Sequence, residues 1–327
     1  MIDLLSLIKD TSAYRTILGD KEKDTLSHAY LLLTADGDYL DEYLKIFTKL
    51  MLCSSPSFCN DCRVCRLIDD WTFSDVYYFP KNGDAVTAED INAVVEESYL
   101  KPIEGKKKIF VLSHAEKMNL AAQNKLLKTL EEPPTGVHIL IGATSEYPLL
   151  PTVKSRVKKL ELPLISADKL FDALKGEYPD KEKLLKAIAC GDGTVGKAVS
   201  LYSDKKLKEL TDLVVDMLVN MKSSSQTLEY SGKIFKLDVD PAEFISVTEL
   251  MLRDLLLINS GDESAVFSVS EKEKLKKAEG FTEGALLYAL DSVRECGKRK
   301  KFNANPTMLI EWLLFKILEG KYKWQKL

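Results

Sequence analysis

Four of the six cysteines stand close together early in the chain, at Cys53, Cys59, Cys62 and Cys65. Their spacing is C-x5-C-x2-C-x2-C. Four thiolates in one short stretch match a tetrahedral structural zinc site, which is closed to water and therefore not catalytic. Such a site could contribute about 10–16 kcal/mol of apparent binding free energy, enough to order a module too small for its own core. A redox pair and incidental thiols are the alternatives that the spacing leaves open.

The turn after the first predicted strand carries the wrong residues for binding phosphate. A working phosphate loop needs glycines that let backbone N–H groups converge, a Lys to neutralise charge, and a Ser or Thr to hold magnesium. Here one glycine remains, the Lys–Ser/Thr pair is absent, and four acids would repel the phosphates of a nucleotide. The degenerate loop comprises Thr34, Ala35, Asp36, Gly37 and Asp38, followed by Asp41 and Glu42.

The end of the third predicted strand also lacks the acids that position magnesium and water in a nucleotide-hydrolysing domain. It runs Leu112-Ser113-His114-Ala115-Glu116, in which Glu116 alone is acidic and lies beyond the expected place. His28, His114 and His138 lie at or near strands without a Ser or Cys nucleophile beside them, so we assign them no catalysis. Two losses in the same machinery argue against ATP hydrolysis by this chain.

Apolar runs and helical patterns alternate through the first half of the chain. Thr87 and Asn119 are predicted helix caps, and Pro133-Pro134 stops the second of these helices. Alternation of this kind predicts an α/β fold with a mainly parallel sheet covered on both faces. The predicted strands are His28–Leu33, Val76–Phe79, Ile109–Leu112, Val137–Gly142 and Val157–Leu162, and Tyr39–Leu52 has helical spacing after the first of them.

After Pro163 the strand signals thin out and helical spacing takes over. We therefore divide the chain into an α/β domain at 1–163 with an inserted zinc module at about 53–65, a small helical domain at 164–203, and a helical C-terminal domain at 204–327. The predicted helices are Ser166–Lys175, Lys181–Ala189, Leu207–Met221, Pro241–Ile258, Ser270–Glu279, Thr282–Cys296, and a last one capped by Asn305 with Pro306 at its first position.

The composition is that of an ordinary soluble globular protein, with 45% hydrophobic and 29% charged residues. A net charge of -4 means that any contact with DNA must come from local patches. The basic runs Lys106–Lys108 and Lys298–Lys301 are read as solvated faces, and the Lys321–Lys326 tail as a fraying end that could touch DNA or a partner. We expect no membrane span and no signal peptide, and therefore a cytoplasmic protein.

Three stretches resemble the clamp-loader branch of AAA+ proteins, particularly its delta-prime subunits. His28-Ala29-Tyr30-Leu31 opens the first strand as in that family. The helix Asn119–Pro134, with the sequence NLAAQNKLLKTLEEPP, is very similar to the family's helix after the third strand. Leu149–Arg156 resembles the segment that carries the family's Ser-Arg-Cys motif, with Val157 in place of the cysteine. Phe302–Pro306 is loosely similar to the loop before the family's last helix.

The resemblance implies an AAA+-like domain, a lid domain and a collar domain within a hetero-pentamer. Its partners would be the delta and gamma/tau types of clamp-loader subunit. Such an assembly opens a ring-shaped sliding clamp and places it on primed DNA during replication. In it ATP lies between subunits, and a neighbour supplies an arginine to the γ-phosphate. The chain would thus be a non-catalytic subunit of a DNA polymerase III complex, with no ATP bound at its own site.

The same resemblance assigns roles to single residues. Ser155 and Arg156 occupy the motif position, so Arg156 is the candidate arginine finger acting in trans; an ordinary surface arginine at the end of a short helix is the alternative. A finger of this kind is worth about 10³–10⁵ in rate. Thr144 stands where the family has a polar sensor, although a strand-end cap is an equal reading. Gly196, next to Lys197, stands where active subunits carry a sensor arginine. The family's zinc module lies at the place of the four cysteines, with a longer first spacing.

Two other functions remain open from the sequence. One is a divergent AAA+ ATPase or nucleotidase with an altered loop. The other is a zinc-dependent nucleic-acid-binding protein that acts alone.

Overall fold

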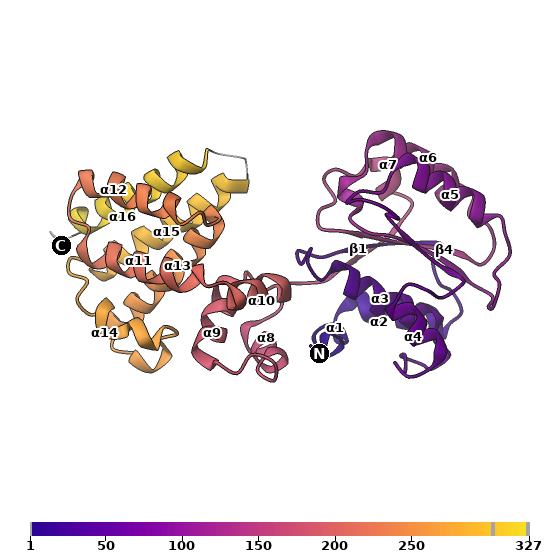
Figure 1. Ribbon diagram of the computed structural model, residues 1–327, viewed down its shortest axis with the longest axis horizontal. Helices are drawn as coiled ribbons and strands as arrows, with labels where there is room; N and C mark the ends of the chain where they lie inside the picture. Colours follow the sequence, from indigo (N-terminus) through magenta and orange to yellow (C-terminus); the bar gives the residue numbers. More distant parts are fainter. Residues whose placement is uncertain (1, 302–304, 325–327) are drawn as a thin grey trace. The chain divides into compact units, whose positions relative to one another are not determined.

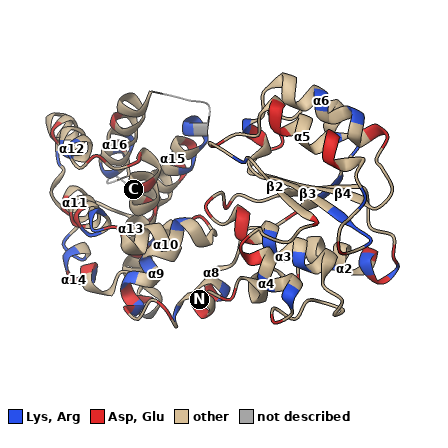
Figure 2. Cartoon of the chain, turned by 45° about the vertical axis from the view of Figure 1, so that its right-hand side comes forward, with Lys and Arg blue, Asp and Glu red and all other residues tan. Residues whose placement is uncertain are grey.

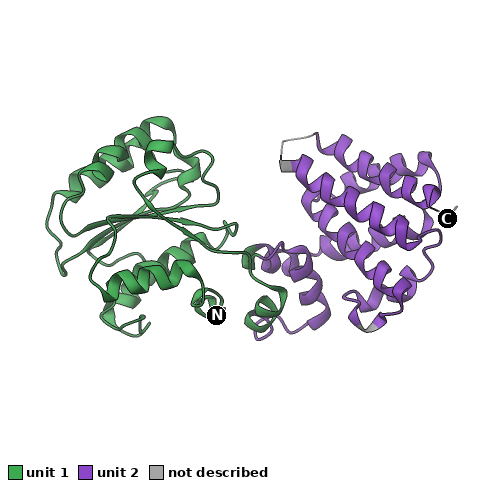
Figure 3. Ribbon diagram, turned by 180° about the vertical axis from the view of Figure 1, so that it is seen from behind, with its two compact units in different colours: residues 1–173, 194–196 green, residues 174–193, 197–327 purple. Residues whose placement is uncertain are grey.

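The computed structural model describes residues 2–301 and 305–324. Two compact units make up this part of the chain (Figure 3). Unit 1 comprises Met1–Ala173 together with Thr194–Gly196, and unit 2 comprises Leu174–Gly193 together with Lys197–Leu327. The loop residues Phe302–Ala304 and the last residues of the Lys321–Lys326 tail lie outside the described residues. The division into three domains stays a prediction.

Unit 1 is built on a five-stranded sheet in the order β2-β3-β4-β1-β5, in which all paired strands run parallel (Figure 1). β1, β3 and β4 are buried along most of their length, as expected of strands covered on both faces. The predicted α/β class with a parallel sheet is confirmed. The strands are β1 Ala29–Leu33, β2 Val76–Phe79, β3 Lys108–Leu112, β4 Val137–Ala143 and β5 Lys158–Glu161.

Helices cover both faces of this sheet (Figure 1). On one face lie α5 Ala88–Ser98, α6 Leu120–Glu131 and α7 Pro151–Lys154. On the other lie α1 Leu4–Ile8, α2 Ser12–Glu22, α3 Leu40–Leu52 and α4 Arg63–Asp69. Two further short elements of this part of the chain are the 3-10 turn Ala115–Lys117 and α8 Ala167–Leu174.

The helix caps predicted at Thr87 and Asn119 are confirmed. Both are hydrogen bonds between residues three apart, which is why the sequence could predict them. Thr87 and Asp90 form a reciprocal capping box at the start of α5, and the Asn119 side chain accepts from the Ala122 N–H at the start of α6. On α6 the buried face includes Ala122, Gln123 and Leu126, whereas Leu120 is 63% exposed. The stretch that resembles the family thus includes an exposed leucine as well as the buried face of α6.

Unit 2 is helical throughout its described residues, as predicted, and its helices share one apolar core. The predicted helix Ser270–Glu279 is wrong: a 3-10 turn, Val269–Glu271, precedes a single turn of helix, α14 Lys272–Leu275. Residues 271–277 are Glu or Lys except for the buried Leu275, which leaves no continuous apolar face to extend the helix. The other helices are α9 Lys181–Cys190, α10 Val195–Ser203, α11 Lys206–Asn220, α12 Ser224–Lys236, α13 Pro241–Ser260, α15 Glu283–Lys301 and α16 Pro306–Lys323.

Charge is mixed over each unit, as the small net charge predicts: Figure 2 shows Lys and Arg interspersed with Asp and Glu. Among the described helices, none combines the length and the apolar character that crossing a membrane requires.

Candidate metal centre, phosphate-loop edge and arginine

The four clustered cysteines come from the end of one helix, the start of the next, and the loop between. Cys53 directly follows α3 and is buried, whereas Cys59 lies exposed in the loop. Cys62 caps α4, and Cys65 lies buried in its first turn. Cys53 has the spacing that departs from the family pattern, and its position at the end of α3 brings it to the other three cysteines.

The four sulfur atoms converge on one point. All lie within 4.8 Å of one another, and Sγ of Cys53 is 3.8 Å from that of Cys59 and 3.9 Å from that of Cys62. A zinc–sulfur bond of about 2.3 Å in a tetrahedral site requires sulfur–sulfur distances of about 3.8 Å. The donor set therefore fits a structural metal ion, and the cluster could hold one.

Backbone amides favour thiolate at the exposed end of this cluster. The Cys62 N–H donates to Sγ of Cys59 at 3.3 Å, and N–H groups of Cys62 and Asp61 lower the pKa of the Cys59 thiol to about 6. Burial instead raises the pKa of Cys65 to about 12. A bound cation would supply the positive charge that a thiolate at this buried position lacks.

Side chains from the surrounding helices hold the cysteine loop in place. Nζ of Lys49, on α3, lies 2.5 Å from the Asp69 carboxylate and 2.8 Å from Oδ1 of Asn60. Nζ of Lys21, on α2, donates to the Ser55 carbonyl at 2.6 Å. The loop is thus anchored at both ends of its span by lysines that are largely buried or half-buried.

The degenerate phosphate loop follows β1 at the carboxyl edge of the sheet, and Asp36 is buried within it. Its carboxylate accepts the N–H of Val195 at 2.8 Å, the N–H of Gly196 at 3.2 Å and the Tyr43 hydroxyl at 3.3 Å. Burial raises the pKa of Asp36, and the donors from Gly196, Val195 and Tyr43 offset part of that shift. The Asp36 N–H in turn donates to Oγ1 of Thr34.

Two glycines allow this close packing. A Cβ on Gly196 would lie 2.6 Å from Cβ of Asp38 and 2.7 Å from Oδ1 of Asp36, distances that real side chains do not reach. A Cβ on Gly37 would lie 3.1 Å from Cγ2 of Thr144. The position where active subunits would carry a sensor arginine therefore has no room for any side chain beside this loop.

The other acids of this edge also accept protein donors. Asp41 accepts the hydroxyls of Tyr78, at 2.8 Å, and Ser113. Glu116 accepts the Thr144 N–H at 3.1 Å and lies 3.2 Å from Nδ1 of His114. The strand ends where magnesium and phosphate would be held are occupied by hydrogen bonds within the protein.

A shallow depression of about 480 Å³ lies beside the loop, lined in part by Thr34, Ala35 and Thr144. Its lining includes Glu146 and Glu161 but neither Lys nor Arg. Both carboxylates pair with Lys159, at 3.1 Å and 2.6 Å, so that ammonium group is already engaged and the lining itself offers phosphate no cation.

The predicted arginine, Arg156, lies just after α7 and is about one-third exposed. Nη2 pairs with the half-exposed Glu131 carboxylate at 2.7 Å, and Nη1 donates to the Thr152 carbonyl and to Oγ of Ser155. The partly exposed guanidinium is therefore held by groups of unit 1.

Gln123 links α6 to the segment that carries Arg156, a role that the sequence did not reveal. Its buried amide donates to the carbonyls of Met118 and Pro148 and accepts the Leu150 N–H at 2.7 Å. The sequence offered one sign of this role, namely a polar residue at a position on the apolar face of the predicted helix. Tyr43 and Tyr78, which donate to Asp36 and Asp41, were also missed, because aromatic residues on apolar faces read as core.

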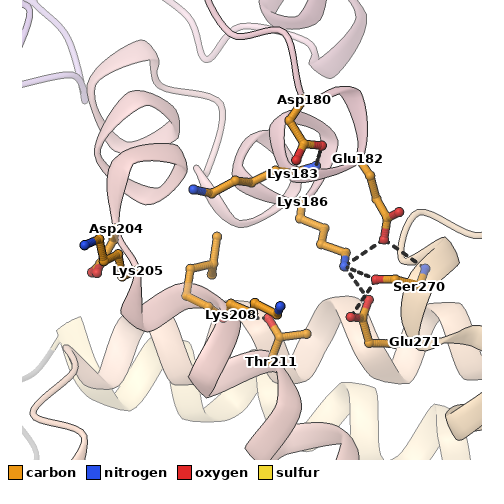
Figure 4. A pocket seen from close by; sticks show the side chains of 11 residues that line it. Asp180, Glu182, Lys183, Lys186, Asp204, Lys205, Lys208, Thr211, Ser270 and Glu271 are labelled. Atoms are coloured by element: carbon orange, nitrogen blue, oxygen red, sulfur yellow. Dashed lines mark hydrogen bonds and ion pairs between the residues drawn. The ribbon is translucent and has the colours of Figure 1, made fainter.

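Unit 2 contains a pocket of about 390 Å³ between α9, α11 and the 3-10 turn Val269–Glu271 (Figure 4). In its wall Lys186 pairs with Glu182, at 2.9 Å, and with Glu271. Burial would raise the pKa of Glu182, but hydrogen bonds from Ser270 and Lys186 outweigh it and lower the pKa to about 2. This network joins α9 to the turn, and we assign the pocket no ligand.

A family model described as DNA polymerase III, delta subunit, matches residues 9–166. The chain is 25% identical to DNA polymerase III subunit delta' of Bacillus subtilis, over 91% of this chain and 93% of that protein. The chain is a homologue of the delta-prime subunits. The resemblance to delta-prime subunits that the sequence predicted is thereby confirmed.

The homology extends to the gamma/tau type of subunit. The chain is 24% identical to DNA polymerase III subunit tau of Bacillus subtilis over 91% of this chain, and it spans 58% of the length of tau. Among solved structures, it is similar to a DNA polymerase III gamma subunit-related protein from Thermotoga maritima, with 19% identity, coverage of 95% of this chain and 100% of that one, and a TM-score of 0.40.

Proposed function

We propose that this chain is a non-catalytic subunit of a DNA polymerase III clamp loader. It assembles with delta-type and gamma/tau-type subunits, and the assembly places a sliding clamp on primed DNA. The observation that carries the proposal is the internal pairing of Asp36, Asp41 and Glu116 at the carboxyl edge of a delta-prime-like sheet. A delta-prime homologue built in this way contributes structure and surface residues to the assembly instead of its own ATPase site.

The proposal predicts that the purified chain neither binds nor hydrolyses ATP. The donors that would meet phosphate are engaged, and the depression beside the loop has no cationic lining. Calorimetric titration with magnesium-ATP should give no measurable heat of binding. Tight binding would contradict the proposal, and turnover would instead favour a divergent ATPase.

Arg156 is the residue that we propose acts on a neighbouring subunit's ATP. It lies partly exposed at the end of a short helix, and its carboxylate partner, Glu131, is itself half exposed. Exchange of that surface ion pair for a phosphate is energetically small, because exposed ion pairs contribute little. A guanidinium, planar and permanently charged, suits the phosphate better than an ammonium does.

The complex should be reconstituted with Arg156→Ala, with Arg156→Lys, and with Lys154→Ala, at the end of α7, as the matched control. Loss of a trans arginine predicts a fall in the ATPase rate of the complex that approaches 10³–10⁵-fold, and little recovery with Lys. Complex assembly should be unchanged. Normal ATPase activity and clamp loading with Arg156→Ala would remove the finger assignment.

We propose that the ion held by the four cysteines is structural zinc. The sulfur geometry fits tetrahedral coordination, and no position is left for a substrate or water. Metal analysis of the full chain should find about one zinc per chain. A protein without bound metal would contradict this, and salt-sensitive DNA binding by the isolated chain that chelation abolishes would favour a nucleic-acid-binding function for the module.

A further inference from the structure

The buried carboxylate of Asp36 lies at the N-terminus of a helix distant from it in sequence. Val195 and Gly196 are the first two residues of α10, and their N–H groups point at the carboxylate. The N–H groups of a first helical turn have no partners within the helix and carry partial positive charge. This is the arrangement by which helices bind the phosphates of ligands, here satisfied by a side chain of the same chain.

The surroundings of Asp36 are shaped to hold that carboxylate in one place. The Tyr43 hydroxyl, from the buried face of α3, donates to it, and Oγ1 of Thr34 accepts the Asp36 N–H. Gly196 admits the loop because a side chain there would overlap Asp36 and Asp38. Thr194–Gly196 also belong to the same compact unit as the sheet, although the rest of α10 does not.

We propose that Asp36 is a built-in substitute for a nucleotide phosphate, which pins Thr194–Gly196 to the carboxyl edge of the sheet. The degenerate loop then has a structural role of its own. Its Asp36 carboxylate occupies the place of the anion that an ATPase would bind from solution. Asp36 and Gly196 work as a pair, since the carboxylate needs the space that the glycine leaves. The start of α10 should accordingly be ordered equally with and without nucleotide.

Amide hydrogen exchange of the full purified chain tests this directly, because the proposed donors are themselves exchangeable amides. Asp36→Ala should accelerate exchange at Val195 and Gly196 by about 10- to 100-fold, the range expected when hydrogen bonds to a charged group are lost. Asp38→Ala, which removes the exposed neighbouring acid, is the matched control and should leave both amides protected. Protection of the strand amides in both variants verifies that unit 1 remains folded.

Chemical rescue separates the role of the anion from the role of the loop's shape. In Asp36→Ala, sodium formate places a free carboxylate in the space vacated, and it should restore protection of the two amides where sodium chloride does not. Unchanged exchange in Asp36→Ala would overturn the proposal. Accelerated exchange that formate does not reverse would overturn the claim that the anion is what holds the segment. Neither result depends on assembly with other subunits, so the clamp-loader proposal is tested separately.

Discussion

The cysteine module and the phosphate-loop edge are two polar clusters of unit 1 with opposite organisation. In the module, four sulfur atoms face one another at distances that suit a shared ion, while backbone amides approach from outside. At the loop edge, the carboxylates of Asp36 and Asp41 accept hydroxyl or N–H donors from several strands and helices. Ligand atoms that converge on a common point indicate a binding site, whereas acceptors that already have donors indicate structure.

Removal of the proposed metal should produce the largest effect, because Phe58 and Ile68 are the only buried apolar side chains besides the cysteines within residues 53–69. Cys65→Ser should abolish metal binding and expose residues 53–69 to proteases, since about 10–16 kcal/mol of metal binding would no longer order them. Cys190→Ser, at a buried thiol of unit 2, is the control and should keep the zinc content. The measurements are metal content and limited proteolysis. A Cys65→Ser protein that still carries one zinc would invalidate the four-cysteine site.

Removal of one acid from the loop edge should lower the stability of unit 1 by less, because several other hydrogen bonds also stabilise that edge. Asp41→Ala leaves the hydroxyls of Ser113 and Tyr78 without their acceptor, and Ser113 is fully buried. We expect the free energy of unfolding of unit 1, measured with urea, to fall by about 1–3 kcal/mol. Glu42→Ala, at the next residue and exposed, should change it by less than about 0.5 kcal/mol.

The Asp41→Ala variant also tests whether the acids at the loop edge have a structural role or only block a site that could otherwise bind ATP. Asp41→Ala removes a negative charge near the expected phosphate position, yet it should not confer ATP binding, because Asp36 still occupies the donors of α10. If calorimetry detected magnesium-ATP binding to Asp41→Ala, the contrast between the two clusters would be wrong.

Local patterns in the sequence predicted the sheet and the clustering of the four cysteines but not the contacts that fill the loop edge. The strands and the caps at Thr87 and Asn119 depend on neighbours a few residues away, so periodicity and residue type suffice. The bond from Val195 to Asp36 joins residues 159 positions apart, and no periodic pattern records such a pair. Gly196 could be read only as a missing arginine until its contact with Asp38 gave the physical reason. The helices α1, α2, α10 and α12 were likewise not predicted.

The ionisation of Asp36 should give unit 1 a pH dependence of stability that the Asp36→Asn variant lacks. The donors from Gly196, Val195 and Tyr43 offset only part of the rise in the pKa of Asp36 that burial causes. Ionisation of Asp36 therefore costs more in the folded than in the unfolded protein, and stability is lost as the pH rises through the folded pKa. As the pH rises from the unfolded pKa through the folded pKa, the stability of the wild type should therefore fall relative to Asp36→Asn, which does not ionise. Asp38→Asn should run parallel to the wild type. The measurement is urea unfolding of unit 1 at a series of pH values, and parallel curves for Asp36→Asn and wild type would contradict a raised pKa.

The smallest effect is expected where the cysteine module touches the rest of unit 1 through exposed charges. Arg63, on α4, pairs with both oxygens of Glu104, and Ser74 donates to the same carboxylate. Because the Arg63 side chain is 65% exposed, solvent screens the pair, and Arg63→Ala should lower stability by less than Asp41→Ala does. Zinc content should not change, with Arg66→Ala on the same helix as the control. Loss of zinc from Arg63→Ala alone would mean that the module is held by this surface pair and not by its own ligands, which would reverse the contrast with the loop edge.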